Sequence, residues 1–149
     1  MTARWIAASL HLLALGIGLG SVWARGRALR LLPSEPAIRQ VFLADTLWGL
    51  AAVLWISTGL WRLLGGLEKS TNYYLGNHIF LAKMALLAVV LLLELLPMIT
   101  LIRWRAAFAK GRALDSRKAP LLARISFIQA GLVALMVFAA TAMARGMGE

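Results

Sequence analysis

The residues of this 149-residue chain that could do chemistry are few, and they interrupt long apolar runs. Lys83 and Glu94 lie inside the apolar stretch from residue 72 to residue 105. At the middle of a membrane helix, each charge would cost about 2.5–3.5 kcal/mol. Because they are eleven residues apart, they fall within about 20° of each other on one helical face. Both side chains should therefore face protein, water or a ligand instead of lipid.

The chain has two histidines, His11 and His78, and no cysteine, and this inventory limits the cofactors that it could hold. Without thiolates, and with carboxylates expected at the opposite membrane face, the histidines cannot complete a tetrahedral zinc site. A b-type haem needs only one or two axial ligands, so His11 could hold one, and His78 is the other candidate metal ligand. Copper bound by His11 and methionine sulfur is a weaker alternative.

Four apolar runs must position these residues. The chain is 61% hydrophobic and 15% charged, with a mean hydropathy of +0.79, which excludes an ordinary soluble domain. The runs predict membrane-spanning helices at about residues 5–24, 41–64, 77–102 and 121–144. Connectors of this length favour antiparallel neighbours. We therefore expect a single all-α membrane domain over residues 1–149, folded as an antiparallel four-helix transmembrane bundle.

Basic residues gather in the connectors between the first and second spans and between the third and fourth spans. The opposite side carries only Arg4, Arg62, Lys69 and Arg145. By the positive-inside rule, both termini lie outside, and the two basic connectors face the cytoplasm and its anionic lipids. The net charge of +10 thus indicates orientation in a bilayer and not a nucleic-acid partner.

Counting along the helices places His11 and Lys83 at a similar depth, in a polar layer near the outer face. Gly18 lies on the small-residue face that contains His11, which would leave room for a flat ligand, and a similar stripe of the second span ends toward Arg62. We expect His11, Lys83, Gly18 and Arg62 to bind a cofactor, although Lys83 could instead snorkel to the interface. His78 is about 140° from Lys83 around the helix, so it points away from this layer.

Asp45 and Glu94 are expected in a second, inner layer near the cytoplasmic face. Arg39 and Arg103 are close in sequence to the two carboxylates and are the candidates to neutralise them. Structural ion pairs with the basic rim are the simpler interpretation of this layer, and a proton path is the alternative.

Several short motifs make the chain similar to a known family. They are LHLLAL around His11, WGLAAVLWISTGLWR around Gly49 and Arg62, and a third region that contains Glu68–Lys69, Tyr73–Tyr74, Asn77, Phe80, Lys83–Met84, Pro97, Thr100 and Arg103–Arg105. In these motifs the chain resembles the bacterial four-span predicted membrane proteins called domain of unknown function 2214. The resemblance covers nearly the whole chain and implies a multi-pass protein of the bacterial inner membrane.

That family is distantly similar to the HemJ-type protoporphyrinogen oxidases and the copper-resistance D proteins. These share a histidine early in the first span and, in HemJ, a lysine in a later span. Only His11 and Lys83 of this sequence match those positions. The resemblance therefore implies a b-type haem at His11, with Lys83 as second ligand or electrostatic partner.

Three functions remain open from the sequence. The leading hypothesis is a redox-type membrane protein that binds a b-type haem near the outer face through His11. The second is a non-catalytic accessory subunit of a larger membrane complex, or a homodimer, whose polar residues serve assembly. Copper or proton handling is the third. The sequence contains no recognised catalytic motif, so it names no catalytic residue.

Overall fold

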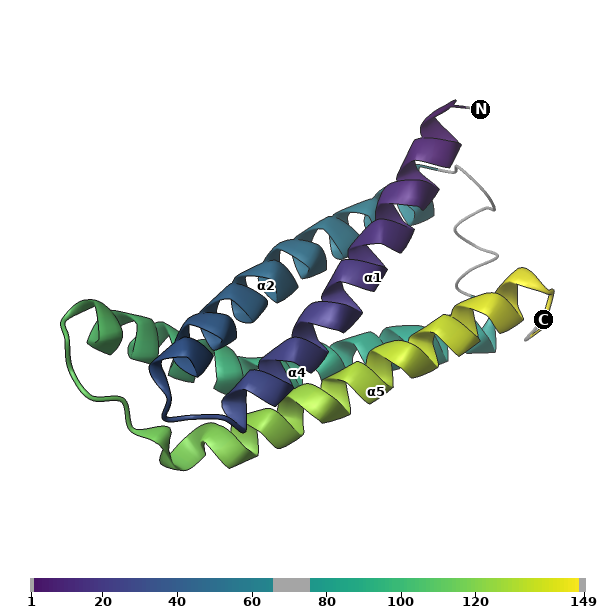
Figure 1. Cartoon of the computed structure of the whole chain (residues 1–149). Coiled ribbons are helices and arrows are strands. Elements are labelled where there is room, and N and C mark those ends of the chain that lie inside the picture. Colours follow the sequence, from purple (N-terminus) through teal and green to yellow (C-terminus); the bar gives the residue numbers. More distant parts are fainter. Residues whose placement is uncertain (1, 66–75, 148–149) are drawn as a thin grey trace.

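The computed structural model describes residues 2–65 and 76–147 (Figure 1). Over these residues it is all-helical, with four long helices, α1 (Thr2–Leu29), α2 (Glu35–Leu64), α4 (His78–Ala109) and α5 (Ala119–Ala144), and a short 3-10 helix, η1 (Ser116–Lys118). Each long helix is long and apolar enough to cross a membrane. The predicted fold class is therefore confirmed. Glu68, Lys69 and Tyr73–Tyr74, which entered the orientation count or the family resemblance, lie outside the described residues.

Local sequence explains where the helices begin and end. Pro36 occupies the first turn of α2, where its missing N–H loses no hydrogen bond. Asn77 caps α4, because its side-chain oxygen accepts from the backbone N–H of Phe80 at 3.1 Å. Gly111 follows the end of α4 with a φ of 64°, a conformation that glycine adopts without strain. The helices extend beyond the predicted apolar spans, and α4 continues through Pro97.

The helices pack in the spatial order α2, α1, α5, α4, which differs from their order in the chain. Helix α1 packs along both α2 and α5, and α4 packs along α5, while the backbones of α2 and α4 seldom approach closely in the described part of the chain. Side chains join α2 to α4 at the basic end, where the Phe42 and Phe108 rings meet edge-on. Figure 1 shows the α1–α2 pair diverging from the α4–α5 pair toward the end where both termini lie. We call this the terminal end and the opposite one, which carries the connectors, the basic end.

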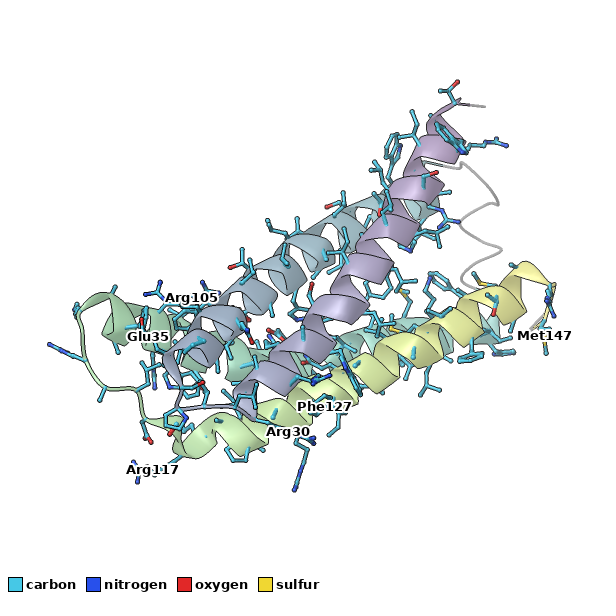
Figure 2. The ribbon with its side chains drawn as sticks, viewed as in Figure 1. Arg30, Glu35, Arg105, Arg117, Phe127 and Met147 are labelled. Atoms are coloured by element: carbon cyan, nitrogen blue, oxygen red, sulfur yellow. The ribbon has the colours of Figure 1, made fainter. Side chains whose placement is uncertain are left out.

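The apolar core is densest at the basic end. One cluster there joins buried residues of α1, α2, α4 and α5, among them Leu29, Val41, Leu101 and Leu122. The cluster nearest the terminal end is small and is built on Ala14, Trp55 and Met136. Many large apolar side chains point outward, as Figure 2 shows, and a surrounding bilayer would cover them. The charged side chains Arg30, Glu35, Arg105 and Arg117 gather at the basic end in the same view.

Candidate functional site

His11 lies on α1, and α2 fixes the orientation of its ring. Its Nδ1 lies 3.1 Å from the carbonyl oxygen of Trp55 and 3.0 Å from Oγ1 of Thr58. The Thr58 hydroxyl donates its own proton to the carbonyl of Leu54 at 2.7 Å, so both neighbours of Nδ1 are acceptors. Two acceptors beside Nδ1 favour the tautomer that carries its proton there, in which Nε2 of a neutral ring has the lone pair. Gly59 permits this close packing, because a Cβ at that position would lie 3.3 Å from His11 Cε1.

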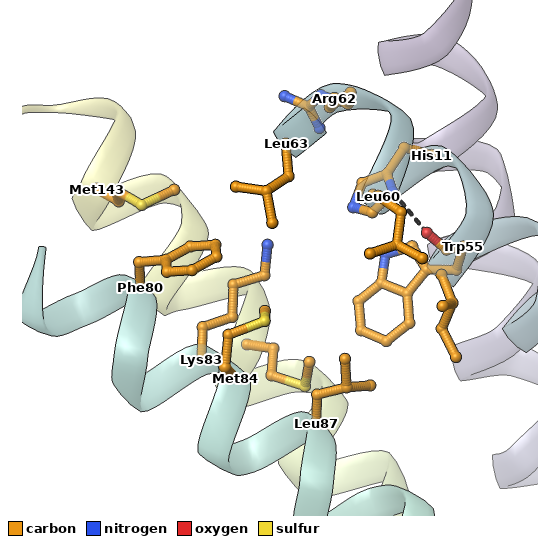
Figure 3. A pocket seen from close by; sticks show the side chains of 13 residues that line it. His11, Trp55, Leu60, Arg62, Leu63, Phe80, Lys83, Met84, Leu87 and Met143 are labelled. Atoms are coloured by element: carbon orange, nitrogen blue, oxygen red, sulfur yellow. Dashed lines mark hydrogen bonds between the residues drawn. The ribbon is translucent and has the colours of Figure 1, made fainter. Parts of the chain in front are cut away.

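A cavity of about 140 Å³ adjoins this histidine, where α2 and α4 diverge (Figure 3). His11, Arg62 and Lys83 contribute polar groups to its wall. The indole N–H of Trp55, which lines the same cavity, is buried and has no hydrogen-bond partner among the described residues. Apolar side chains complete the wall, including Phe80, Met84, Leu87, Met136 and Met143. The cavity thus combines a lone-pair nitrogen, two basic side chains and an N–H donor with an apolar lining.

Gly18 lies in the contact between α1 and α2 and does not belong to the described wall of the cavity. A Cβ on this residue would lie 3.4 Å from the ring of Trp48 and 3.5 Å from the Cβ of Ala51. Its small size lets the two helices approach, as small residues do in membrane helix pairs.

His78 is exposed at the first residue of α4 and does not line the cavity. No cluster of three or more histidine, aspartate or glutamate side chains is placed to hold a metal ion in the described ranges. An ion that needs three or more histidine or carboxylate ligands therefore has no ready site in these ranges.

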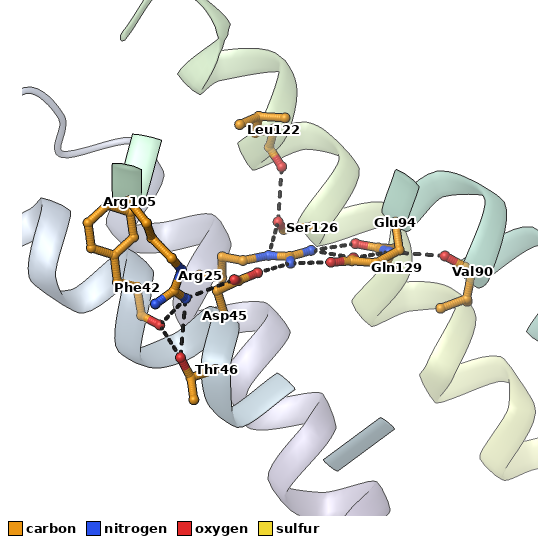
Figure 4. A network of polar contacts seen from close by, with 10 residues as sticks. All are labelled: Arg25, Phe42, Asp45, Thr46, Val90, Glu94, Arg105, Leu122, Ser126 and Gln129. Atoms are coloured by element: carbon orange, nitrogen blue, oxygen red, sulfur yellow. Dashed lines mark hydrogen bonds and ion pairs between the residues drawn. The ribbon is translucent and has the colours of Figure 1, made fainter. Parts of the chain in front are cut away.

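A network of charged side chains crosses the bundle toward the basic end (Figure 4). Its centre is Arg25 of α1, whose side chain is 0% exposed. Nη1 donates to Oδ1 of Asp45 at 2.9 Å and to Oε1 of Glu94 at 2.7 Å, and Nη2 donates to Oε2 of Glu94 at 2.8 Å. Nε donates to Ser126 at 3.1 Å, and Nη2 also donates to Gln129 at 2.9 Å. One guanidinium thereby joins α1 to the three other long helices.

The second carboxylate oxygen of Asp45 binds Arg105 of α4, whose Nη2 lies 2.9 Å away. The same nitrogen donates to the carbonyl of Phe42 at 2.8 Å. Two arginines thus face two carboxylates, so the network is balanced in charge. Charge balance and satisfied hydrogen bonds are what make buried ion pairs tolerable in a low-dielectric interior.

The predicted partners of the two carboxylates are wrong. Arg39 pairs with Glu35 one turn earlier in α2, at 2.9 Å, and both side chains are exposed. Arg103 is exposed as well. It follows Glu94 by nine residues, which places it on the opposite side of the helix. Proximity in sequence therefore misidentified the partners, whereas the helical angle excludes Arg103.

The role of Arg25 was missed because an arginine at the end of a membrane helix usually extends to the interface. A signal was nevertheless present. Arg25 follows Gly18 by seven residues, so it lies on the same face as the small residues around His11. Ser126 and Gln129 of the fourth span are at a similar distance from the basic end and offer it further hydrogen-bond acceptors.

Comparison with known proteins supports the membrane assignment and assigns no activity. A family model described as "Predicted membrane protein (DUF2214)" matches residues 3–148. No curated protein and no solved structure matches the chain. The expected distant similarity to HemJ-type and copper-resistance D proteins stays a prediction.

Proposed function

We propose that this chain, which belongs to the DUF2214 family of predicted membrane proteins, binds a b-type haem at the cavity between α2 and α4. In this proposal Nε2 of His11 is an axial ligand, and Lys83 is the second ligand or an electrostatic partner. With the orientation predicted from the basic connectors, the site lies near the outer face of the bacterial inner membrane.

The observation that carries the proposal is the hydrogen bonding of the His11 ring. Ligating histidines usually donate their second N–H to a carbonyl or carboxylate, which fixes the tautomer and the ring orientation. Nδ1 of His11 has this arrangement, with the Trp55 carbonyl at 3.1 Å and the Thr58 hydroxyl at 3.0 Å. The nitrogen that would ligate the iron therefore holds its lone pair before any ligand arrives.

The other polar groups of the cavity match the periphery of a haem. A haem carries propionate carboxylates, and an arginine or lysine binds a carboxylate through charge-assisted hydrogen bonds. Arg62 and Lys83 line the cavity together with His11. The indole N–H of Trp55 would gain an acceptor from a bound carboxylate. The apolar side chains of the wall would contact the macrocycle and exclude water from it.

The volume of the cavity sets a condition on the proposal. About 140 Å³ suits a single aromatic ring, and sites for larger organic ligands usually enclose about 300–1,000 Å³. A porphyrin must therefore extend from the cavity into the seam between α2 and α4. The backbones of these helices seldom approach closely, and the side-chain contacts between them, such as Arg105 with Phe42 and Asp45, lie at the basic end. The helices can therefore separate at the terminal end without breaking those contacts. Haem binding should consequently widen the terminal end of the bundle.

When bound, a haem would supply one-electron chemistry, and the protein would set its potential through ligands, burial and nearby charge. In this chain His11 would bind the iron, and Trp55 and Thr58 would orient the imidazole. Lys83 and Arg62 would place positive charge beside the macrocycle, which favours its reduced form.

An absorption spectrum tests the proposal. Protein produced with haem supply and purified in mild detergent is expected to show a Soret band. His11→Ala should abolish it, whereas His78→Ala, which removes the exposed histidine at the start of α4, should leave it unchanged. Lys83→Met should alter the band positions if the amine ligates, and only weaken haem retention if it acts by charge. A folded protein without a Soret band, or an unchanged band in His11→Ala, would refute haem binding at this site.

The seam also supports a second candidate function, the accessory subunit, because a partner helix could cover α2 and α4 where they make little contact. In that case the chain purified by itself would carry no cofactor. Purified from its native membrane, it would be accompanied by a stable membrane partner in constant ratio. The two proposals therefore predict opposite spectra.

A further inference from the structure

We infer that the α1–α5 face at the basic end is a binding site for the headgroup of an anionic phospholipid. The site is formed by Arg27 of α1, by Arg30 directly after its end, and by Arg124 and Phe127 of α5. It is independent of the proposed haem site, which lies toward the terminal end.

Phe127 is the fixed centre of this surface. Its ring lies directly against the backbone of α1, where a Cβ on Gly26 would be 3.0 Å from the ring. Trp23 meets the ring edge-on, with centroids 4.9 Å apart and planes at 71°. The guanidinium of Arg30 lies over the same ring, 4.4 Å from its centroid, so a cation–π contact restrains this exposed side chain.

Two hollows flank this centre, and each brings arginines together. One, of about 560 Å³, is lined by Arg27, Arg30, Trp23 and Phe127. The other, of about 610 Å³, is lined by Arg30, Arg124 and Phe127 and by apolar side chains. Arg30 and Phe127 belong to both hollows, so a phosphate in either one would meet two arginines.

The carboxylates of the described residues leave these arginines without a protein counter-ion. Glu35 pairs with Arg39, and Asp115 pairs with Arg117. The remaining two described carboxylates are held in the buried network of Figure 4. None of the four pairs with Arg27, Arg30 or Arg124. The positive charge of this surface is therefore available to an anion from outside the chain.

The position of the surface favours a lipid as the source of that anion. Trp23 is exposed seven residues before Arg30, about 10 Å deeper along α1, where an indole typically marks the membrane interface. Each hollow also has an exposed apolar side chain in its lining. This side chain is Leu31 in the hollow beside Trp23 and Ile128 in the hollow beside Arg124. A phosphate at the arginines would thus place acyl chains along an apolar helix face. Basic pockets between membrane helices bind anionic headgroups in this way.

Native mass spectrometry can test the site with phosphatidylglycerol and phosphatidylcholine of equal chain length added in equal amounts. The wild-type protein should retain phosphatidylglycerol preferentially. The double substitution R30Q/R124Q should weaken its retention at least about ten-fold, since each basic residue near a membrane contributes roughly a five-fold factor. The matched control R39Q/R117Q removes two positive charges from the same end and should change retention less than two-fold. Equal losses in both variants, or no preference in the wild type, would overturn the inference.

Trp23 provides an independent reporter. Brominated phosphatidylglycerol should quench indole fluorescence more than brominated phosphatidylcholine, and Trp23→Phe should remove that difference. All variants must elute as the wild type on size exclusion and keep its circular dichroism, which is expected because the four arginines are exposed. If the difference in quenching persists in Trp23→Phe, the lipid binds elsewhere and the inference fails.

Discussion

Substitution of Arg25 by methionine would test whether the buried charge network holds the bundle together. The change keeps an unbranched side chain of similar length but removes five hydrogen bonds to Asp45, Glu94, Ser126 and Gln129. Asp45 keeps a cation, because Arg105 lies 2.9 Å from its other oxygen. Among the described residues, Glu94 keeps the amide of Gln129, 2.8 Å away, as its side-chain partner. The substitution therefore leaves a carboxylate that is only 20% exposed without a cation among these residues.

The magnitude follows from that stranded charge. Removing one partner of a buried ion pair usually costs about 3–5 kcal/mol, whereas a hydrogen bond between neutral groups inside a membrane contributes on average about 0.6 kcal/mol. The unpaired charge of Glu94 therefore accounts for most of the expected loss of stability. Arg25→Met should therefore lower the free energy of unfolding by about 3 kcal/mol, the lower end of that range, because the Glu94 side chain is still 20% exposed.

Unfolding in mixed micelles, with sodium dodecyl sulfate as denaturant and circular dichroism as the signal, measures this loss. The control is Arg39→Met, which breaks the pair with Glu35, whose side chains are 67% and 65% exposed, and should cost less than about 1 kcal/mol. The double substitution R25M/E94Q should recover part of the loss at pH 7. If Arg25→Met costs no more than Arg39→Met, the network does not stabilise the bundle as argued.

Three further predictions concern single contacts. Thr58→Val removes an acceptor from Nδ1 of His11 and should weaken haem binding about 10–100-fold, measured by haem titration of the stripped protein; unchanged affinity would exclude a role for the hydroxyl. Asn77→Ala removes the cap of α4 and should destabilise the protein by about 1 kcal/mol in the same micelle assay, and a value near zero would show that the cap contributes nothing. Arg117, through its hydrogen bonds, lowers the pKa of exposed Asp115 to about 2. The ion pair between them should therefore be intact at every pH above the ordinary pKa of aspartate, and it should be lost as the pH falls through about 2. In carbon-13 NMR of labelled protein, Arg117→Gln should raise that pKa toward 3.8, and an unchanged pKa would contradict the assigned cause.

The sequence predicts the spans well because the cost of exposing backbone to lipid leaves long apolar helices as the available structure. It predicts their partners less well. The consecutive pairs α1–α2 and α4–α5 pack together, as the connectors favour, but α2 and α4 are also consecutive and their backbones seldom approach closely. Side chains that hydropathy does not weigh hold α4 on α5, such as Gln129 of α5, which donates to the carbonyl of Val90 and to Glu94 of α4 at 3.1 and 2.8 Å.

The candidate site shows the same division between what spacing can and cannot predict. Helical counting brings His11 and Lys83 to one depth, and both line the cavity. It could not show that the Trp55 carbonyl fixes the His11 ring, because that contact depends on how α1 and α2 rotate against each other. Gly18 could not be assigned for the same reason, since a small residue serves a ligand or a neighbouring helix equally well.

Lys83 and Glu94 share one face of α4 and still act in different parts of the molecule. Glu94 binds Arg25 and so ties α4 to α1 and, through Asp45, to α2 near the basic end. Lys83 lies eleven residues earlier and lines the cavity between α2 and α4 (Figure 3). Ion pairs thus hold α2 and α4 together near the basic end. The two helices can move apart at the terminal end without breaking these ion pairs. A ligand larger than the cavity would therefore enter at Lys83, because widening at Glu94 would strand the buried charges.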